Sequence, residues 1–360
     1  MKEKFSKHIE FIKSYWEILF FLAGFFFDIF TLGEAEDSFN ILQQVFYITF
    51  SILFLTYELR KQLDEGYKPH PFLLKNAPYL NLAFHFFIGS LLSAFLIFFF
   101  KSSSIISSGF FIISITTAFI INEFTVSDRW NLIIKSVLLF ICINSFFSYI
   151  FVFPLGFIGF IPFLLGLIIN LFITWALFTY LKSKEISLDQ LNNNFFFPAI
   201  TTTILFVSFY MLNILPPVPI AIKQARVCRE VSKNNENYLC YHSKLWWNFW
   251  DKGEQVFRYE KGDKVYVFFS IFSPLKFSDS VSINWYYKQN GQWVKTDGIQ
   301  VQLTGGRRHG FRAYVYKKNL QTGNWYTTVT TKDSREVGRI YFKVRPKEPN
   351  EIITLKTEMF

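Results

Sequence analysis

The chain has 360 residues, of which 51% are hydrophobic, 21% are aromatic and only 18% are charged. This balance excludes an ordinary soluble enzyme and is typical of a membrane protein that carries a soluble part. The net charge of +10 belongs to the end of the chain, since residues 1–216 hold 13 Lys and Arg against 14 Asp and Glu, and residues 217–360 hold 24 against 13. An apolar part is therefore followed by a basic part.

The apolar part, residues 1–216, is expected to be a polytopic helical domain. A helix needs about 20 apolar residues to cross a membrane, and seven stretches qualify: 12–32, 39–58, 80–100, 104–123, 131–153, 155–181 and 196–216. The fifth and sixth are divided at Pro154, where a turn is expected. No small-residue cleavage site follows the first stretch, so we interpret it as a retained span.

The loops between these spans predict an orientation, because short loops rich in Lys and Arg stay in the cytoplasm. The N-terminus and the second, fourth and sixth loops carry such residues, namely Lys2, Lys4, Lys7, Lys13, Arg60, Lys61, Lys68, Lys75, Arg129, Lys182 and Lys184. The alternate loops are acidic or nearly bare of charge. The N-terminus is thus predicted in the cytoplasm, and seven crossings leave the C-terminal part outside.

Charged and polar side chains within the spans form a second group of candidates: Asp28, Glu17, His85, Glu123 and Lys135. A charge in hydrocarbon costs about 2.5 kcal/mol or more and is usually functional or paired. These residues fit a proton or ion relay, or a polar pocket for a lipid headgroup. The alternative is snorkelling and hydrogen bonding between helices, including a Glu123–Lys135 pair across one short loop.

Residues 217–254 are expected to be a connecting segment after the helix-stopping prolines of LPPVP, 215–219. From Ile220 a helical projection places Lys223, Arg226, Arg229 and Lys233 on one face. This pattern predicts a short amphipathic helix, either on the membrane surface or packed on the following domain. Cys228 and Cys240 form a disulfide candidate in an oxidising compartment, with two free or buried thiols as the alternative.

Residues 255–346 alternate with a period of two, which indicates strands. In VSINWYYK, 281–288, Val281, Ile283 and Trp285 share one face. Turns are expected at Asn290-Gly291, Asp297-Gly298 and Gly323-Asn324. About seven or eight short strands predict an all-β immunoglobulin-like antiparallel sandwich, followed by a C-terminal tail, 347–360. We interpret Trp285, Trp293 and Trp325 as core or sheet-face residues rather than ligand platforms.

The segment GGRRHG, 305–310, is the main candidate for ligand binding. Its glycines permit a tight reversal, and Arg307, Arg308, His309 and Arg312 form a candidate anion patch with donors suited to carboxylate or phosphate. The alternative is a glycine hairpin with solvated basic residues. The sequence shows no phosphate-binding, hydrolase or zinc-protease motif, and its five histidines do not cluster with Cys and carboxylates at metal-ligand spacing. We therefore predict no catalytic residues, no metal and no cofactor.

Several motifs follow one another along the chain: VYVFFSIFSP (265–274), Trp285-Tyr286, GGRRHGFRAYVYKK (305–318), GNW (323–325) and GRIYFKV (338–344). Together they resemble the bacterial domain-of-unknown-function family 2914. The helical part is similar to polytopic members of that family through AGFFFDIFTLGEAEDS (23–38), NEF (122–124) and LPPVP (215–219). The resemblance implies a membrane-anchored, extracytoplasmic β domain, and it brings no known activity.

These observations predict a binding or sensing module in the bacterial cytoplasmic membrane. Its partner is expected to be an envelope glycan, an anionic lipid or another protein, and not nucleic acid, because the basic domain lies outside the cytoplasm. A transporter or channel component that uses the intramembrane charges is the alternative. The oligomeric state does not follow from the sequence.

Overall fold

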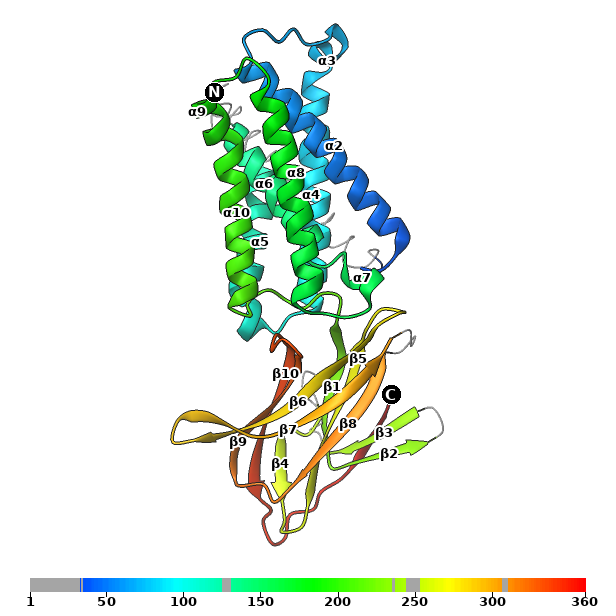
Figure 1. Cartoon of the computed structure of the whole chain (residues 1–360). Helices are drawn as coiled ribbons and strands as arrows, with labels where there is room; N and C mark the ends of the chain where they lie inside the picture. Colours follow the sequence, from blue (N-terminus) through cyan, green and yellow to red (C-terminus); the bar gives the residue numbers. More distant parts are fainter. Residues whose placement is uncertain (1–32, 34, 125–130, 235–236, 244–252, 306–309) are drawn as a thin grey trace, which may run out of the picture.

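The computed structural model describes residues 33, 35–124, 131–234, 237–243, 253–305 and 310–360. Within them, long helices form a bundle, and a β domain lies at one end of it (Figure 1). The helical elements are α2 (Ser38–Leu63), α3 (Pro71–Lys75), α4 (Ala77–Lys101), α5 (Ile105–Phe124), α6 (Asn131–Phe147), α7 (Val152–Leu155), α8 (Phe160–Lys182), α9 (Leu188–Leu191), η1 (Asn192–Phe196) and α10 (Phe197–Met211).

Six described stretches are long and apolar enough to cross a membrane, judged by length and composition: Ser38–Leu63, Ala77–Lys101, Ile105–Asn122, Leu132–Leu155, Phe160–Lys182 and Leu188–Met211. Each overlaps one predicted span. The predicted span over 12–32 lies outside the described residues, so the count of seven stays a prediction. The predicted separation of the fifth and sixth spans is confirmed, because α6 and α8 are separate helices, but Pro154 lies inside α7 and the chain turns after it, from Gly156.

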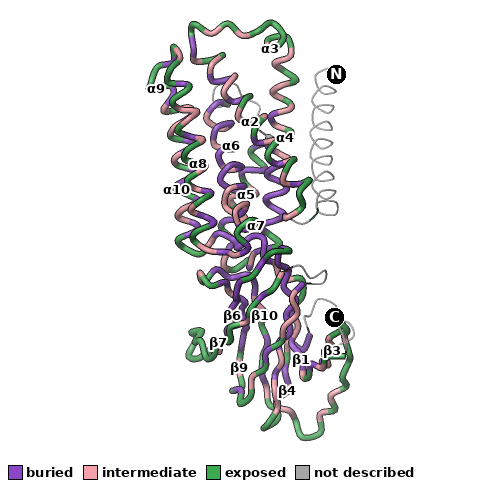
Figure 2. Tube along the Cα trace, turned by 45° about the vertical axis from the view of Figure 1, so that its right-hand side comes forward, coloured by how far each residue is buried: buried purple, intermediate pink, exposed green. Residues whose placement is uncertain are grey.

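The bundle exposes many apolar side chains and buries several polar ones beside its apolar core; Figure 2 shows the buried and exposed positions along the chain. On α8, Phe172 and Trp175 are 61% and 62% exposed, whereas Asn170 and Thr174 are buried. With 23 residues, α8 is about 35 Å long at 1.5 Å per residue, which exceeds the ~30 Å hydrocarbon core. Apolar side chains can therefore meet lipid while polar side chains hydrogen-bond between helices.

The β domain contains eleven strands among the described residues: β1 (Ala221–Cys228), β2 (Glu230–Asn234), β3 (Asn237–His242), β4 (Val256–Tyr259), β5 (Lys264–Phe272), β6 (Ser278–Gln289), β7 (Gln292–Thr304), β8 (Phe311–Lys318), β9 (Gly323–Thr331), β10 (Glu336–Pro346) and β11 (Lys356–Met359). Their sheet orders are β1-β5-β8, β4-β10-β9-β6-β7 and β11-β3-β2. Paired strands are antiparallel except β4 and β10, which run parallel.

One hydrophobic core joins the first two sheets. It contains Val267 and Phe269 of β5 together with Ile283 and Trp285 of β6. The alternation predicted for VSINWYYK is therefore confirmed, because Ile283 and Trp285 are fully buried in this core. The predicted turn at Asn290-Gly291 is also confirmed, since these residues have φ of 50° and 83° and join β6 to β7.

Two expectations about the β domain are wrong. Residues 221–228 and 230–234 form β1 and β2, not an amphipathic helix. Pairing with β5 buries Val227, and such tertiary pairing outweighs a weak helical preference. Asp297-Gly298, expected as a turn, lies inside β7 beside a bulge opposite Trp285 and Tyr286.

The predicted domain limits also change. Because β1 pairs with β5, residues 217–254 are part of the β domain rather than a connecting segment. Residues 356–359 pair with β3, so 347–360 is not a free tail. The strands of the β domain thus extend from Ala221 to Met359.

The β domain contacts the bundle directly. The Ser278 amide donates to the Gly156 carbonyl at 2.8 Å, and the Ile158 amide donates to Asp279 Oδ2 at 3.1 Å. On α10, the Tyr210 hydroxyl donates to Asp333 Oδ2, in the turn between β9 and β10, at 3.0 Å. The strands therefore have a defined position relative to the helices.

Candidate functional site

The outer face of the five-stranded sheet carries a group of aromatic side chains. We call this group the aromatic platform and define it as Tyr286, Trp293, Tyr326 and Tyr341. Strand alternation places these residues opposite the core, because their neighbours Trp285, Trp325 and Phe342 point inward. Trp293 and Tyr341 are 37% and 40% exposed, whereas Tyr326 beneath them is buried.

The four rings of the platform contact one another. Tyr286 stacks on Tyr326 with ring centroids 4.6 Å apart, and Trp293 meets Tyr326 edge-on at 4.6 Å. Tyr341 lies 5.3 Å from Tyr326. These are favourable distances for aromatic pairs, so the rings form one surface with its outer members open to solvent.

Arg339 fixes one edge of the platform. Its Nε donates to Glu336 Oε1 at 2.6 Å, and its Nη1 donates to the Tyr341 hydroxyl at 2.9 Å. The guanidinium also lies over the Tyr326 ring, 4.9 Å from the centroid. Burial would lower the pKa of Arg339, but hydrogen bonds to Glu336 and Tyr341 raise it above its ordinary value. Arg339 therefore stays charged and held in place.

Two buried polar groups lie beside the aromatic platform, on the same face of the sheet. Asn284 donates through Nδ2 to Thr330 Oγ1 at 3.0 Å, but its Oδ1 has no hydrogen-bond partner within the protein. The Thr328 hydroxyl also lacks one. Gly298 leaves room for Asn284, since a Cβ there would lie 2.8 Å from Oδ1. Most buried polar groups are paired, so these two have unused hydrogen-bonding capacity.

Lysines surround the platform. Lys295 lies opposite Tyr286, and Lys288 lies opposite Trp293, with its ammonium 5.6 Å from the centroid of the Trp293 ring. Lys343 follows Tyr341 by two residues and therefore lies on the same side of β10. Together with Arg339, these lysines place four cations around the platform, beside the carboxylate of Glu336.

This platform was not predicted from the sequence, although the sequence carries one signal for it. A two-residue turn at Asn290-Gly291 sets Lys288 opposite Trp293. Trp293 must then share the face of Lys288 rather than that of Trp285. No comparable signal exists for Tyr326 and Tyr341, because strands β9 and β10 join the platform through long-range pairing.

The predicted anion patch is described only in part. Arg312 donates from Nη1 to the Phe360 backbone oxygen at 3.0 Å and lies over the Tyr238 ring, 5.4 Å from its centroid. It therefore holds the last strand of the described chain against β8. Arg307, Arg308 and His309 lie outside the described residues, so their convergence with Arg312 stays a prediction.

Two intramembrane candidates contact neighbouring helices. His85 Nδ1 lies 3.1 Å from Asn122 Oδ1, and the buried Lys135 donates to Asn81 Oδ1 at 2.6 Å. Asp28, Glu17 and the side chain of Glu123 lie outside the described part of the chain. The Glu123–Lys135 pair and the relay interpretation therefore stay predictions.

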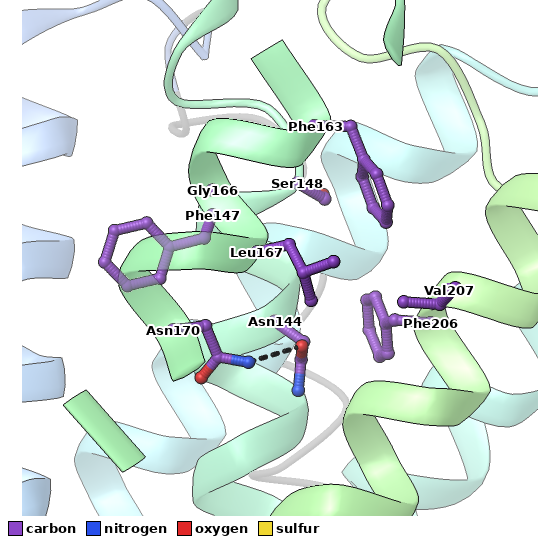
Figure 3. Close-up of a pocket in the computed structure, with 9 residues that line it drawn as sticks. All are labelled: Asn144, Phe147, Ser148, Phe163, Gly166, Leu167, Asn170, Phe206 and Val207. Atoms are coloured by element: carbon purple, nitrogen blue, oxygen red, sulfur yellow. Dashed lines mark hydrogen bonds between the residues drawn. The ribbon is translucent and has the colours of Figure 1, made fainter. Parts of the chain in front are cut away.

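A small polar pocket lies between α6, α8 and α10 (Figure 3). Asn170 donates through Nδ2 to Asn144 Oδ1 at 2.8 Å and to Thr203 Oγ1 at 3.1 Å. Asn170 Oδ1 has no partner within the protein. The free space is about that of one water molecule, which suits a buried water better than a transported solute.

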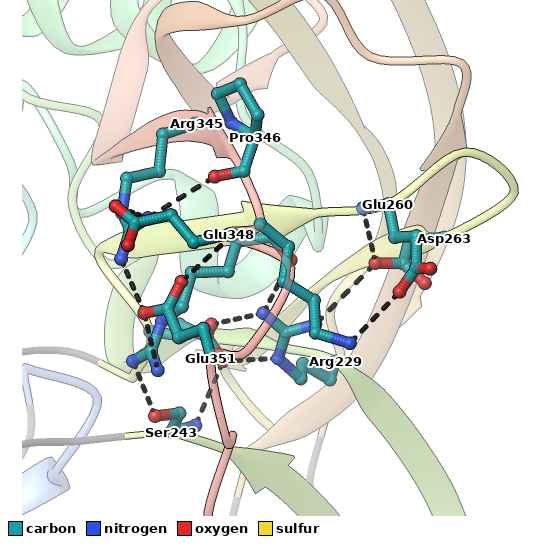
Figure 4. A network of polar contacts seen from close by, with 11 residues as sticks. Arg229, Ser243, Glu260, Asp263, Arg345, Pro346, Glu348 and Glu351 are labelled. Atoms are coloured by element: carbon teal, nitrogen blue, oxygen red, sulfur yellow. Dashed lines mark hydrogen bonds and ion pairs between the residues drawn. The ribbon is translucent and has the colours of Figure 1, made fainter.

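An ion-pair network ties β1 to the strands and loops around it (Figure 4). Arg229 donates to both oxygens of Glu254 at 2.6 and 2.9 Å and lies 3.7 Å from Asp263. A second arginine, Arg345, donates to Glu351 at 2.6 Å. Near this network, Cys228 and Cys240 form a disulfide, which is one of the two states left open by the sequence. These contacts are satisfied internally and leave no open ligand position that we can identify among the described residues.

The fold and these sites define a class: a helical protein with six candidate membrane spans and a C-terminal β domain. Residues 278–344 match the family described as "Protein of unknown function (DUF2914)". The resemblance to this family is therefore confirmed for the C-terminal region, which contains the whole aromatic platform. No curated protein matches the chain.

Several solved structures are similar to parts of the chain. An immunoglobulin-like protein from Pseudomonas aeruginosa is 14% identical, with 34% of this chain and 99% of that chain covered and a TM-score of 0.20. A β-glucosidase from Listeria innocua is also 14% identical, with 31% and 16% covered and a TM-score of 0.19. An alkylpurine DNA glycosylase from Pseudomonas fluorescens is 9% identical, with 88% and 100% covered and a TM-score of 0.23. At these scores none carries an argument about the activity of this chain.

Proposed function

We propose that this chain is a multi-pass protein of a bacterial cytoplasmic membrane that presents its β domain on the outer side of that membrane, in the periplasm or outside the cell, as a binding or sensing module. One observation carries the proposal. In the described loops, the basic residues gather at the bundle end opposite the β domain, namely Arg60, Lys61, Lys68, Lys75, Lys182 and Lys184 (Figure 1). At the other end, the described loops between helices contribute only Lys101. Because Lys and Arg in short loops favour the cytoplasmic side, the β domain is assigned to the outer side.

The two sheets with a common core support the further proposal of an immunoglobulin-like sandwich. The disulfide between Cys228 and Cys240 suits an oxidising compartment outside the cytoplasm. We propose binding rather than catalysis, because the outer face of the five-stranded sheet presents an aromatic and basic group of side chains. Transport is not favoured, because the pocket between α6, α8 and α10 holds about one water.

Cysteine labelling in whole cells tests this orientation. Asn290→Cys, in the turn between β6 and β7, should react with a membrane-impermeant maleimide in intact cells. The matched variant Lys68→Cys, in the loop between α2 and α3, should react only after the cells are opened. The opposite pattern would refute the assignment of the β domain to the outer side.

A further inference from the structure

We propose that the aromatic platform and its lysines form a binding site for an anionic glycan, a saccharide chain whose rings carry carboxylate or phosphate groups. This inference rests on the proposed function, because such a ligand is available only to a domain outside the cytoplasm. It names the ligand class of the module and the side chains that would hold it.

The rings supply the first component of the site. One face of a pyranose ring presents mainly C–H groups. These groups pack against an aromatic ring through dispersion and through attraction to the partial negative charge on the aromatic face. Trp293 and Tyr341 are exposed next to each other over the buried Tyr326, with their ring centroids 6.1 Å apart. Tyr326 and Tyr286 support them from below. The platform thus has two open aromatic side chains on a rigid base, which a sugar ring can cover.

Polar groups supply the second component. A saccharide has many hydroxyls, and these need donors and acceptors beside the aromatic surface. Asn284 Oδ1 and the Thr328 hydroxyl lack partners within the protein, while both residues are at least 96% buried. A bridging water can connect such groups to a ligand hydroxyl. Tyr341 adds an exposed hydroxyl at the rim, which Arg339 already orients.

Charge selects an anionic glycan over a neutral one. Lys288, Lys295, Lys343 and Arg339 outnumber Glu336 on this face, for a local formal charge of +3 from the residues named. Arg339 is bound to Glu336, but none of the three lysines has a described carboxylate within ion-pair distance. Carboxylates or phosphates on the sugar rings would complement these lysines. The hairpin of β6 and β7 projects sideways from the β domain (Figure 1), which favours a glycan over the headgroups of the membrane that holds the bundle.

Calorimetric titration of the purified full chain in detergent tests this site. The probes are an oligogalacturonate, a dextran oligomer of similar length and vesicles containing phosphatidylglycerol. We expect the oligogalacturonate to bind and the dextran to bind much more weakly. Trp293→Ala should weaken binding about tenfold, and Trp293→Phe, which keeps a ring, should restore most of it. Tyr316→Ala is the matched control, since Tyr316 is 49% exposed on β8 of the other sheet.

A second variant tests the charge without disturbing the rings. Lys343→Gln should weaken binding about threefold at low salt and have little effect at high salt, whereas Lys261→Gln, in the turn before β5, should have no effect. Absent binding, equal affinity for dextran, binding of vesicles alone, or equal loss in Trp293→Ala and Tyr316→Ala would each overturn the site. Such a result would leave the membrane orientation intact, because cysteine labelling tests that separately.

Discussion

Asp333 is expected to stabilise the contact between the β domain and the helical bundle. Its carboxylate accepts from the Tyr210 hydroxyl at 3.0 Å and from Arg335 Nε at 2.9 Å. The Arg335 guanidinium lies 4.8 Å from the centroid of the Tyr210 ring, and that ring stacks on Phe163 of α8 at 4.1 Å. Removal of the carboxylate would therefore affect the turn, α10 and α8 together.

The expected magnitude follows from these contacts. A hydrogen bond to a charged group contributes about 1.5–3 kcal/mol, and loss of one partner from a buried ion pair costs about 3–5 kcal/mol. The Arg335 side chain is 6% exposed and that of Asp333 is 22% exposed, so solvent reduces the larger figure. We expect Asp333→Ala to lower the free energy of unfolding by about 2–3 kcal/mol. Tyr210→Phe, which removes only one donor, should lower it by about 1.5 kcal/mol.

The pH dependence of the same variant provides an independent measurement. Burial would raise the pKa of Asp333, but the charge of Arg335 and hydrogen bonds from Thr331, Arg335 and Tyr210 lower it below its ordinary value. A carboxyl with a lowered folded-state pKa stabilises the fold fully above its unfolded pKa, about 3.9, and this stabilisation is lost as the pH falls through the folded value. The difference between wild type and Asp333→Ala should therefore be full at pH 7 and shrink below about pH 4.

Chemical denaturation of the full chain in detergent measures the loss of stability and its pH dependence. Hydrogen exchange of residues 205–215 and 327–337 shows whether the change is located at the contact between α10 and the turn. Glu348→Ala is the control, because the Glu348 side chain is 79% exposed and its pairing with Arg345 should contribute little. If Asp333→Ala changed stability no more than Glu348→Ala, or if its effect were unchanged at pH 3, Asp333 would not have the role described.

Two further predictions concern the disulfide of the β domain and the packing of the helical bundle. Cys228→Ser with Cys240→Ser should lower the free energy of unfolding by about 3 kcal/mol, because the disulfide restricts the unfolded chain by joining residues 12 apart in the sequence. Denaturation with and without a reductant measures this, and no difference would show that the disulfide does not stabilise the domain. Gly166→Ala should reduce the yield of folded protein, because a Cβ there would lie 2.0 Å from the Phe147 carbonyl oxygen and force α6 and α8 apart. Gly109→Ala, with no atom within 4 Å of the new Cβ, should be tolerated, and equal yields of the two variants would refute this account of the contact.

Much of the fold could be predicted from local patterns. The positions of the described helices and the separation of α6 from α8 follow from the length of apolar runs and one breaker. The inward face of β6 follows from its period of two. The helix predicted from Ile220 is wrong because basic residues at helical spacing also fit strands: Arg226 of β1 pairs with Glu358, and Arg229, between β1 and β2, pairs with Glu254. Those carboxylates are far away in the sequence, so their pairing could not be read from it.

The candidate site separates what can be predicted from the sequence from what depends on the tertiary structure. By itself, the sequence determined the boundary near residue 216, the apolar spans and the alternation of the strands, because each depends on neighbours along the chain. Only the tertiary structure decided that Trp293 lies against Tyr326 and Tyr341 on the outer face. The physical reason is that β9 pairs with β6 and β10 pairs with β9 through long-range contacts, which neighbours along the chain do not specify.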